Sequence, residues 1–166
     1  MAGLARQESE FNPKAVSVSS ARGLTQIMPS TGRELSRRLR IRPYSTARLF
    51  QPQVNLQLGT YYLRSVVDSV DGRWEAALAA YNAGLSRAKD WSTWGEFREP
   101  AEFVETVPFT QTREYIQIVL RNADIYRQLY AAPEAASVKA AAPARRVSYS
   151  DGIDQRTKSS RASGAR

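Results

Sequence analysis

The sequence predicts an all-α fold, and two patterns along the 166 residues support that prediction. Apolar residues recur at every third or fourth position over long stretches, the spacing that lines one face of a helix. The alternation of apolar and polar residues that marks a half-buried strand is not clear anywhere up to residue 130. We therefore expect one helical domain over residues 1–130.

The first two helices are predicted from a capping signal and from a long apolar stripe. Thr31 and Glu34 have the spacing of a capping box, which predicts a helix that opens there and runs through Leu35 and Leu39. The stripe that follows predicts one long amphipathic helix. Its members are Val54, Leu56, Leu58, Tyr62, Leu63, Val66, Val67 and Val70.

Two more helices are expected before residue 131. Residues 73–83 are apolar and lie between a turn at residues 71–72 and Gly84, which occupies the position of a left-handed C-terminal cap. The last helix is expected to start after Pro108 and Thr110 and to close the domain. Its apolar face consists of Ile116, Val119, Leu120, Ala123, Tyr126 and Tyr130.

Residues 131–166 differ in composition from the rest of the chain. They are rich in Ala, Pro, Ser and Arg and contain almost no large apolar side chains. Such a segment cannot bury enough surface to offset the entropy lost on ordering, so we predict a disordered basic tail.

The residue types that are missing narrow the possible chemistry. The chain has no cysteine, which excludes disulfides, thiolate metal sites and a cysteine nucleophile. It also has no histidine, which excludes Ser-His-Asp catalysis and histidine-bound zinc. Acid–base work must therefore fall to carboxylates, tyrosines or lysines, and we expect neither a cofactor nor a metal.

The formal net charge of +8 suggests an anionic partner, but half of it lies in the predicted tail. Residues 1–130 carry 17 basic and 13 acidic side chains. No nucleic-acid-binding motif is present, so nucleic acid is not the expected partner. No apolar run approaches the roughly 20 residues that cross a bilayer, and residues 1–6 lack the apolar centre of a signal peptide.

Short motifs spread over residues 2–130 resemble the soluble lytic transglycosylase family in the same order and at similar spacing. They are RQES (6–9) with FNP (11–13), GLTQIMP (23–29), AYNAG (80–84), FVETVP (103–108) and TREY (112–115). Each motif alone is weak, but chance agreement of all of them in register is improbable.

The resemblance implies a lysozyme-like helical fold with a groove for glycan strands, and Glu8 as the catalytic acid and base at the end of a helix. It implies cleavage of the β-1,4 bond between N-acetylmuramic acid and N-acetylglucosamine in peptidoglycan, with a 1,6-anhydro product. Glu8 would have to be protonated near neutral pH, which requires a desolvated pocket. Phe11, Met28 and Tyr81 are the predicted wall of that pocket.

The resemblance also implies substrate-binding residues, namely Ser17, Gln26, Met28, Tyr81, Asn82 and Glu105. The tryptophans could stack on sugars, although packing is the expected use of Trp74 and Trp91 more than of Trp94. Ser20, Thr25 and Gln111 depart from the family pattern, and we expect adjusted subsites rather than lost activity.

Only seven residues precede Glu8, where the family has a longer helix and an earlier segment. The sequence therefore predicts an N-terminally truncated part of a larger exported protein. The family implies a periplasmic or cell-envelope location, with peptidoglycan glycan strands as partner and cell-envelope proteins as further possible partners. Two alternatives remain open: a hydrolytic muramidase resembling goose-type lysozyme, and a binding module that holds peptidoglycan without cleaving it.

Overall fold

The computed structural model describes residues 1–131, which contain seven α-helices, one 3₁₀ helix and no strand. The α-helices are α1 (Ala2–Ser9), α2 (Pro29–Arg38), α3 (Pro52–Asp68), α4 (Trp74–Ala83), α5 (Leu85–Trp91), α6 (Pro100–Thr106) and α7 (Thr110–Tyr130). The 3₁₀ helix η1 covers Thr46–Phe50. The all-α prediction is confirmed. The predicted disordered tail lies outside the described residues, apart from Ala131.

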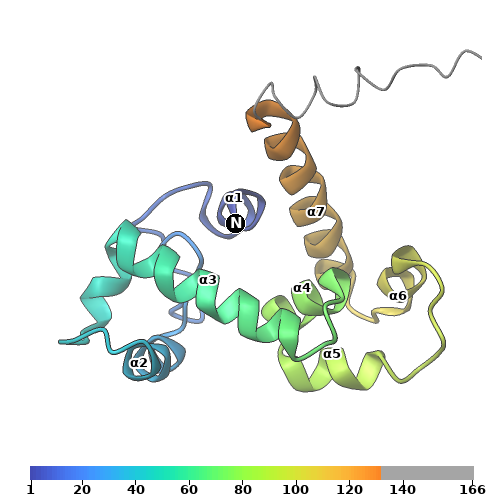
Figure 1. The fold of residues 1–166 in the computed structure, drawn as a ribbon, viewed down its shortest axis with the longest axis horizontal. Helices are drawn as coiled ribbons and strands as arrows, with labels where there is room; N and C mark the ends of the chain where they lie inside the picture. Colours follow the sequence, from blue (N-terminus) through green and yellow to red (C-terminus); the bar gives the residue numbers. More distant parts are fainter. Residues whose placement is uncertain (132–166) are drawn as a thin grey trace, which may run out of the picture. The chain divides into compact units, whose positions relative to one another are not determined.

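The long helix α3 connects two groups of helices, as Figure 1 shows. Near its N-terminal end lie α2 and η1, where the buried residues Ile27, Leu35, Leu49, Val54 and Leu58 form a small core. Near its C-terminal end lies a larger core, to which α1 and α3 to α7 all contribute. Tyr62 and Tyr81 pack against both cores. These two tyrosines therefore mark the junction where the site is built.

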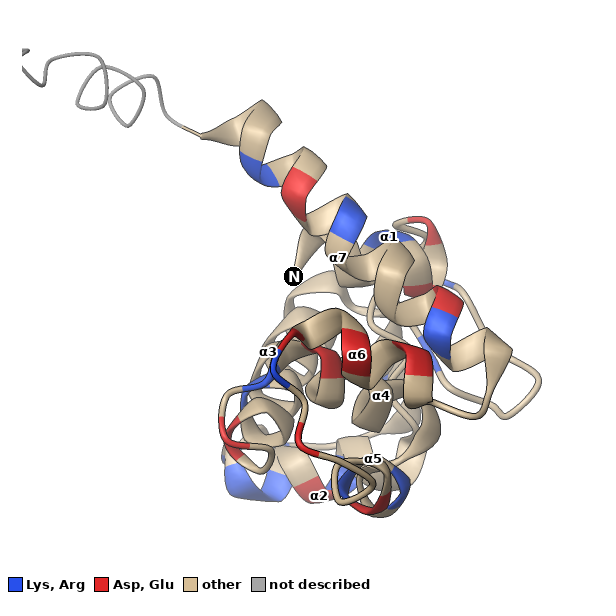
Figure 2. Cartoon of the chain, turned by 90° about the vertical axis from the view of Figure 1, so that its right-hand side faces the viewer, with Lys and Arg blue, Asp and Glu red and all other residues tan. Residues whose placement is uncertain are grey.

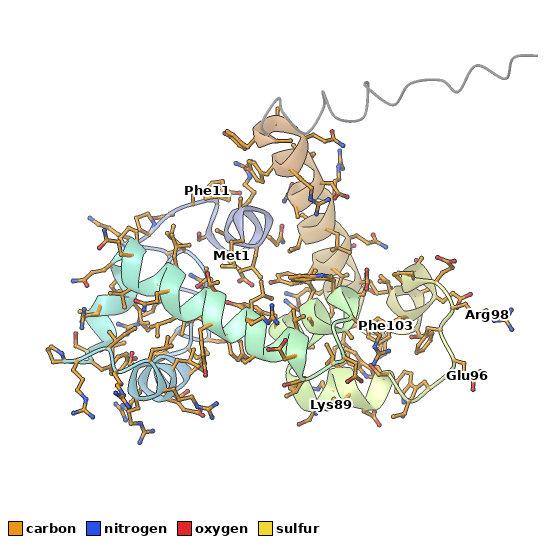
Figure 3. All side chains as sticks on the ribbon, viewed as in Figure 1. Met1, Phe11, Lys89, Glu96, Arg98 and Phe103 are labelled. Carbon is orange, nitrogen blue, oxygen red and sulfur yellow. The ribbon has the colours of Figure 1, made fainter. Side chains whose placement is uncertain are left out.

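The larger core is formed around α4, whose residues Ala76–Ala80 are all buried. Because four of these five side chains are alanine methyl groups, neighbouring helices can pack close to the α4 backbone. Phe103 from α6 packs into this core and meets Phe97 edge to face at 5.5 Å, whereas Lys89, Glu96 and Arg98 point outward (Figure 3).

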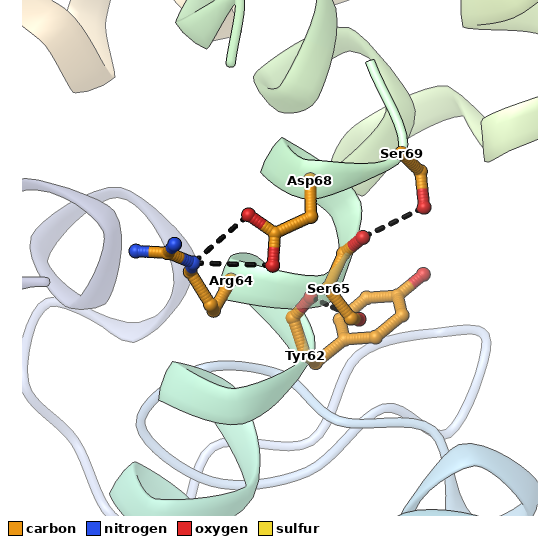
Figure 4. Close-up of polar contacts among 5 residues, drawn as sticks. All are labelled: Tyr62, Arg64, Ser65, Asp68 and Ser69. Carbon is orange, nitrogen blue, oxygen red and sulfur yellow. Dashed lines mark hydrogen bonds and ion pairs between the residues drawn. The ribbon is translucent and has the colours of Figure 1, made fainter. Parts of the chain in front are cut away.

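The exposed side of α3 carries local polar contacts. Arg64 pairs with Asp68 at 2.9 Å, and the hydroxyls of Ser65 and Ser69 donate to the carbonyls of Tyr62 and Ser65 (Figure 4). An exposed pair one helical turn apart adds only about 0.3–0.5 kcal/mol, so the buried face determines where α3 lies.

The observed ends of α2 and α4 differ from the capping signals predicted from the sequence. The predicted capping box is wrong: α2 begins at Pro29 after an extended Met28, and Glu34 pairs with Arg38 one turn later. Proline fits the first turn because its missing N–H has no partner there anyway. Gly84 has the positive φ of 99° that the sequence suggested, but its ψ of 144° lies outside the left-handed helical region. The chain passes directly from Gly84 into α5.

The segment between α1 and α2 is a compact loop. Its backbone forms two isolated bridges, from Val16 to Arg22 and from Arg22 to Ile27. Within the described residues, no helix is both long and apolar enough to cross a membrane.

Candidate active site

Glu8 is positioned by the short helix α1, whose N-terminal residues pack closely against α7. Leu4 and Ala5 are buried, and Gly3 lies so close to α7 that a Cβ there would come within 2.6 Å of the Ala123 nitrogen. The helix ends at Ser9, because Glu10 and Phe11 both take positive φ values of 51° and 64°. Glu8 therefore sits in the last turn of α1 at a fixed distance from α7.

The carboxyl group of Glu8 is half-buried and contacts one hydroxyl group directly. Tyr115, buried on α7, donates its hydroxyl proton to Oε1 of Glu8 at 2.5 Å. Burial raises the pKa of Glu8 from 4.5 to about 7, although the Tyr115 hydrogen bond opposes that change. A carboxyl group with this pKa is present in both protonation states at neutral pH, so it can give up a proton and take one back.

Tyr81 provides a second hydroxyl near Glu8. It donates to the carbonyl of Thr25 at 2.8 Å, and its ring lies 5.1 Å from that of Tyr62. Burial and the negative charge of Glu8 both raise the pKa of Tyr81 far above its ordinary value, so this tyrosine keeps its proton. The hydroxyl oxygen of Tyr81 can therefore act toward a ligand only as an acceptor.

The three residues predicted to wall the pocket differ in exposure. Tyr81 lies close enough to Glu8 for the carboxylate charge to raise its pKa, whereas Phe11 and Met28 are 43% and 39% exposed. The ring of Phe11 meets Tyr126 of α7 edge to face at 5.9 Å (Figure 3 shows Phe11 next to α1). Tyr115, whose hydroxyl contacts Glu8, was not among the predicted site residues.

The sequence could indicate that Tyr115 is buried, but not which residue it contacts. It belongs to the TREY motif and is one turn before Val119 on the apolar face of the last helix. A buried tyrosine needs a hydrogen-bond partner for its hydroxyl, which is a reason to look for one. The partner is 107 positions away in the chain, so no local pattern could identify it.

Two of the three predicted substrate-binding residues before α2 form side-chain hydrogen bonds with the backbone of the loop. The side-chain amide of Gln26 donates to the carbonyls of Gly23 at 2.8 Å and Ala15 at 3.3 Å, so its two protons do not point to Glu8. Ser17 is exposed, and its hydroxyl accepts from the N–H of Ala21 at 3.1 Å. Met28 is exposed at the start of α2.

Asn82 and Glu105 lie on the helices beyond Tyr81. Asn82, in the last turn of α4, accepts a hydrogen bond from the buried hydroxyl of Thr112 at 2.8 Å. Glu105 is exposed on α6 and lines a shallow cavity with Glu75 and Gln117. Of the six predicted substrate-binding residues, Tyr81 lies close enough to Glu8 for the carboxylate charge to raise its pKa. Binding of substrate by all six stays a prediction.

The tryptophans divide differently from the prediction. Trp91 is buried and meets Phe109 edge to face at 5.4 Å, as expected for a packing residue. Trp74, also expected to pack, is 51% exposed, as is Trp94 at 53%. Trp74 is the first residue of α4.

The arrangement has the parts of a proton-transfer site. One carboxyl group with a pKa near neutrality accepts a hydrogen bond from Tyr115 and lies close enough to Tyr81 for its charge to raise the pKa of that tyrosine, and both tyrosines keep their protons. Within residues 1–131, no group of three or more acidic side chains is arranged to hold a metal ion. The chemistry available is general acid and general base catalysis by the same group.

Comparison with known proteins gives a consistent set of relatives. Residues 1–103 match the family model of the transglycosylase SLT domain. The soluble lytic murein transglycosylases of Salmonella typhimurium and Escherichia coli are 38% and 39% identical, over 80% and 75% of this chain. The chain spans about a fifth of the length of these relatives, 21% and 20%.

Solved structures agree in fold. An inactive mutant of the lytic transglycosylase from Pseudomonas aeruginosa superposes with a TM-score of 0.72 at 41% identity, covering 76% of this chain and 20% of that one. The 70 kDa soluble lytic transglycosylase of Escherichia coli gives 0.71 at 38% identity, covering 76% and 21%. The lysozyme-like helical fold implied by the motifs is confirmed.

Proposed function

Because the chain belongs to the transglycosylase SLT domain family, we propose that it cleaves peptidoglycan as a lytic transglycosylase. The bond cut is the β-1,4 bond between N-acetylmuramic acid and N-acetylglucosamine, and the product carries a 1,6-anhydromuramoyl end. The names of its relatives, soluble lytic murein transglycosylases, support this substrate. The observation that supports the reaction is Glu8, a half-buried carboxyl group with a pKa of about 7.

In the first step, protonated Glu8 gives its proton to the glycosidic oxygen while the bond from that oxygen to C1 of the muramoyl residue breaks. In the second step, the Glu8 carboxylate takes the proton of the C6 hydroxyl while O6 bonds to C1. The two steps return Glu8 to its starting state and consume no water. Ordinary glycosidases need a second carboxylate as nucleophile or to activate water, and this reaction needs neither.

The tyrosines support both steps. Tyr115 donates to Glu8 and stabilises the carboxylate that exists between the two proton transfers. Tyr81 offers an acceptor to the N-acetyl group or to a hydroxyl of the sugar. Contacts from Ser17, Gln26, Met28, Asn82 and Glu105 to the glycan remain proposals from the family motifs, as do the periplasmic or cell-envelope location and cell-envelope protein partners.

The test is Glu8→Gln in digests of purified sacculi, with Glu10→Gln as matched control. Glu10 is exposed and lies two residues beyond Glu8, outside the helix. We expect Glu8→Gln to abolish release of anhydromuropeptides, a loss of more than about 10²-fold, whereas Glu10→Gln keeps the wild-type rate. A Glu8→Gln rate within about tenfold of wild type would remove Glu8 from the mechanism.

The product distinguishes the alternatives. Digestion in oxygen-18 water leaves anhydro ends unlabelled, whereas a hydrolytic muramidase places the label at the new reducing end. Labelled reducing ends would show that the enzyme hydrolyses the bond and would contradict the proposed reaction. Retention on sacculi without any release of fragments would favour the binding module.

A further inference from the structure

Thr25 and Asn55 form a fully buried polar pair between the loop and α3. Both residues are 0% exposed. The Oδ1 atom of Asn55 accepts from the backbone N–H of Thr25 at 2.8 Å and from its hydroxyl at 2.7 Å. The amide nitrogen of Asn55 donates to the carbonyls of Arg22 and Leu49, both at 2.8 Å. The hydrogen-bonding capacity of the Asn55 amide is therefore used completely.

Glycine makes this close contact possible. A Cβ on Gly59, one turn after Asn55, would lie 2.3 Å from the Thr25 hydroxyl oxygen. A Cβ on Gly23 would lie 2.4 Å from the Asn55 amide nitrogen. The loop thus rests directly on the α3 backbone, and the polar pair fixes its position there.

Two successive peptide groups of the loop also contact both sides of the candidate active site. The carbonyl of Thr25 accepts the hydroxyl proton of Tyr81 at 2.8 Å, and the carbonyl of Leu24 accepts that of Ser9 at 2.9 Å. Ser9 is the neighbour of Glu8 on α1, and Tyr81 is close enough to feel the charge of Glu8. Two successive carbonyls therefore link α1 and α4, while the side chain between them is bound to α3.

We propose that Asn55 and Thr25 are positioning residues, which hold the backbone carbonyls of Leu24 and Thr25 so that Ser9 and Tyr81 keep Glu8 in its reactive, water-shielded place. The role in turnover rests on the proposed function. The effect on Glu8 itself does not, because its protonation can be followed without substrate. The sequence alone suggested only that Thr25 alters a subsite, but a side chain with no exposed surface has no direct contact with a ligand.

The test uses Thr25→Val, which keeps the shape and removes the hydroxyl, beside Thr25→Ser, which restores it. Ser36→Ala is the matched control, because Ser36 is also buried and its hydroxyl has no hydrogen-bond partner within residues 1–131. Asn55→Ala removes all the bonds at once and risks unfolding, so Thr25→Val carries the test. All variants are compared at a temperature where circular dichroism shows them fully folded.

We expect Thr25→Val to lower kcat about tenfold with KM within about twofold of wild type, since small misplacement of a reacting group is costly. Water that reaches Glu8 lowers its pKa, so the alkaline limb of the kcat/KM profile moves to lower pH. Thr25→Ser recovers most of the rate, and Ser36→Ala resembles wild type. A Thr25→Val enzyme with unchanged kcat and unchanged pH limb would overturn the proposal.

A second readout separates this proposal from the proposed function. Carbon-13 NMR of labelled glutamate follows the Glu8 carboxyl directly, and the signal is assigned by its absence in Glu8→Gln. We expect a titration near pH 7 in the wild type and at lower pH in Thr25→Val. If the chain cuts no peptidoglycan but this shift appears, the proposed function fails and the positioning role remains. Identical titrations in wild type and Thr25→Val would sink the positioning role whatever the activity.

Discussion

The carboxyl group of Glu8 titrates near pH 7 in the folded protein, whereas its ordinary pKa is 4.5. Burial favours the protonated form, so the folded state binds this proton more tightly than the unfolded chain does. The stability contributed by that proton is fully present below about pH 4.5 and is lost as pH rises to about 7. The property that suits Glu8 to proton transfer therefore destabilises the fold at neutral and alkaline pH.

Glu8→Gln should for this reason stabilise the protein at alkaline pH. Glutamine keeps the acceptor for Tyr115 but never ionises, so the variant and the wild type should be about equally stable near pH 4. Near pH 8 the variant should have a free energy of unfolding up to about 3 kcal/mol higher. Urea unfolding at several pH values measures this. A variant less stable than wild type at pH 8 would mean that the site favours the Glu8 anion.

Tyr115→Phe should change the pH dependence of the reaction in a defined direction. The Tyr115 hydrogen bond lowers the pKa of Glu8, so its loss should raise that pKa above about 7 and move the alkaline limb of kcat/KM to higher pH. We expect kcat to fall about tenfold, because the carboxylate loses its donor. Tyr130→Phe, an exposed position on the same helix, is the control. A limb that moves to lower pH would contradict this account of Glu8.

At the scale of the helices, α1 depends on close contact with α7 more than on its own length. An isolated helix of eight residues is marginal in water. Gly3 lets the two backbones approach, since a Cβ there would lie 2.7 Å from the Val119 carbonyl oxygen. The position of Glu8 is consequently set at one end of α1 by Gly3 and at the other by Ser9.

Gly3→Ala should move α1 away from α7 and disturb the Glu8–Tyr115 contact. We expect about 1–3 kcal/mol lower stability, as for other overpacked sites, and a loss of kcat beyond the loss of folded protein. Gly95→Ala is the control, because its Cβ would meet nothing closer than an ordinary contact at 3.6 Å to Phe97. If Gly3→Ala changes neither quantity relative to Gly95→Ala, the α1–α7 contact is not a constraint on the site.

The residue pattern predicted the four helices that have ten or more residues, which are α2, α3, α4 and α7. The apolar stripes of α3 and α7 repeat over several turns, so their period could be read from the sequence alone. α5 and α6 have seven residues each, too few to show a period, and they depend on burying Trp91 and Phe103. Glu8 was found through a motif. Its partner Tyr115 and the buried Thr25–Asn55 pair were not, because these contacts join segments far apart in the chain.

At the scale of the whole molecule, two segments of residues 1–131 carry charges of mainly one sign. Residues 33–48 contain six arginines and one acidic side chain, whereas residues 90–114 contain six acidic and two basic side chains. Figure 2 shows acidic residues along α6 and basic residues near α2. Although the net charge of residues 1–130 is modest, residues 33–48 form a strongly basic region. Its electrostatic field would attract an anionic polymer to the surface around α2.

Neutralising that region should weaken binding to sacculi at low salt. We compare the triple change Arg33→Gln, Arg37→Gln and Arg40→Gln with the control triple Lys89→Gln, Arg98→Gln and Arg121→Gln, which removes the same charge from exposed positions elsewhere. The first should reduce binding several-fold more than the second, and the difference should vanish near 1 M salt, where the Debye length is about 3 Å. Equal losses for both triples would assign the attraction to net charge alone.

The burial of Glu8 also makes its carboxyl group selectively reactive toward reagents that modify protonated acids. Diazo reagents esterify the protonated form of a carboxylic acid, and ordinary carboxyl groups are almost entirely ionised at pH 6.5 to 7. Glu8 is half protonated near pH 7 and only half-buried, so it stays within reach of a small reagent. One ester per molecule would then count the fraction of any preparation whose active centre is correctly assembled, because a frayed α1 leaves Glu8 ionised and unreactive.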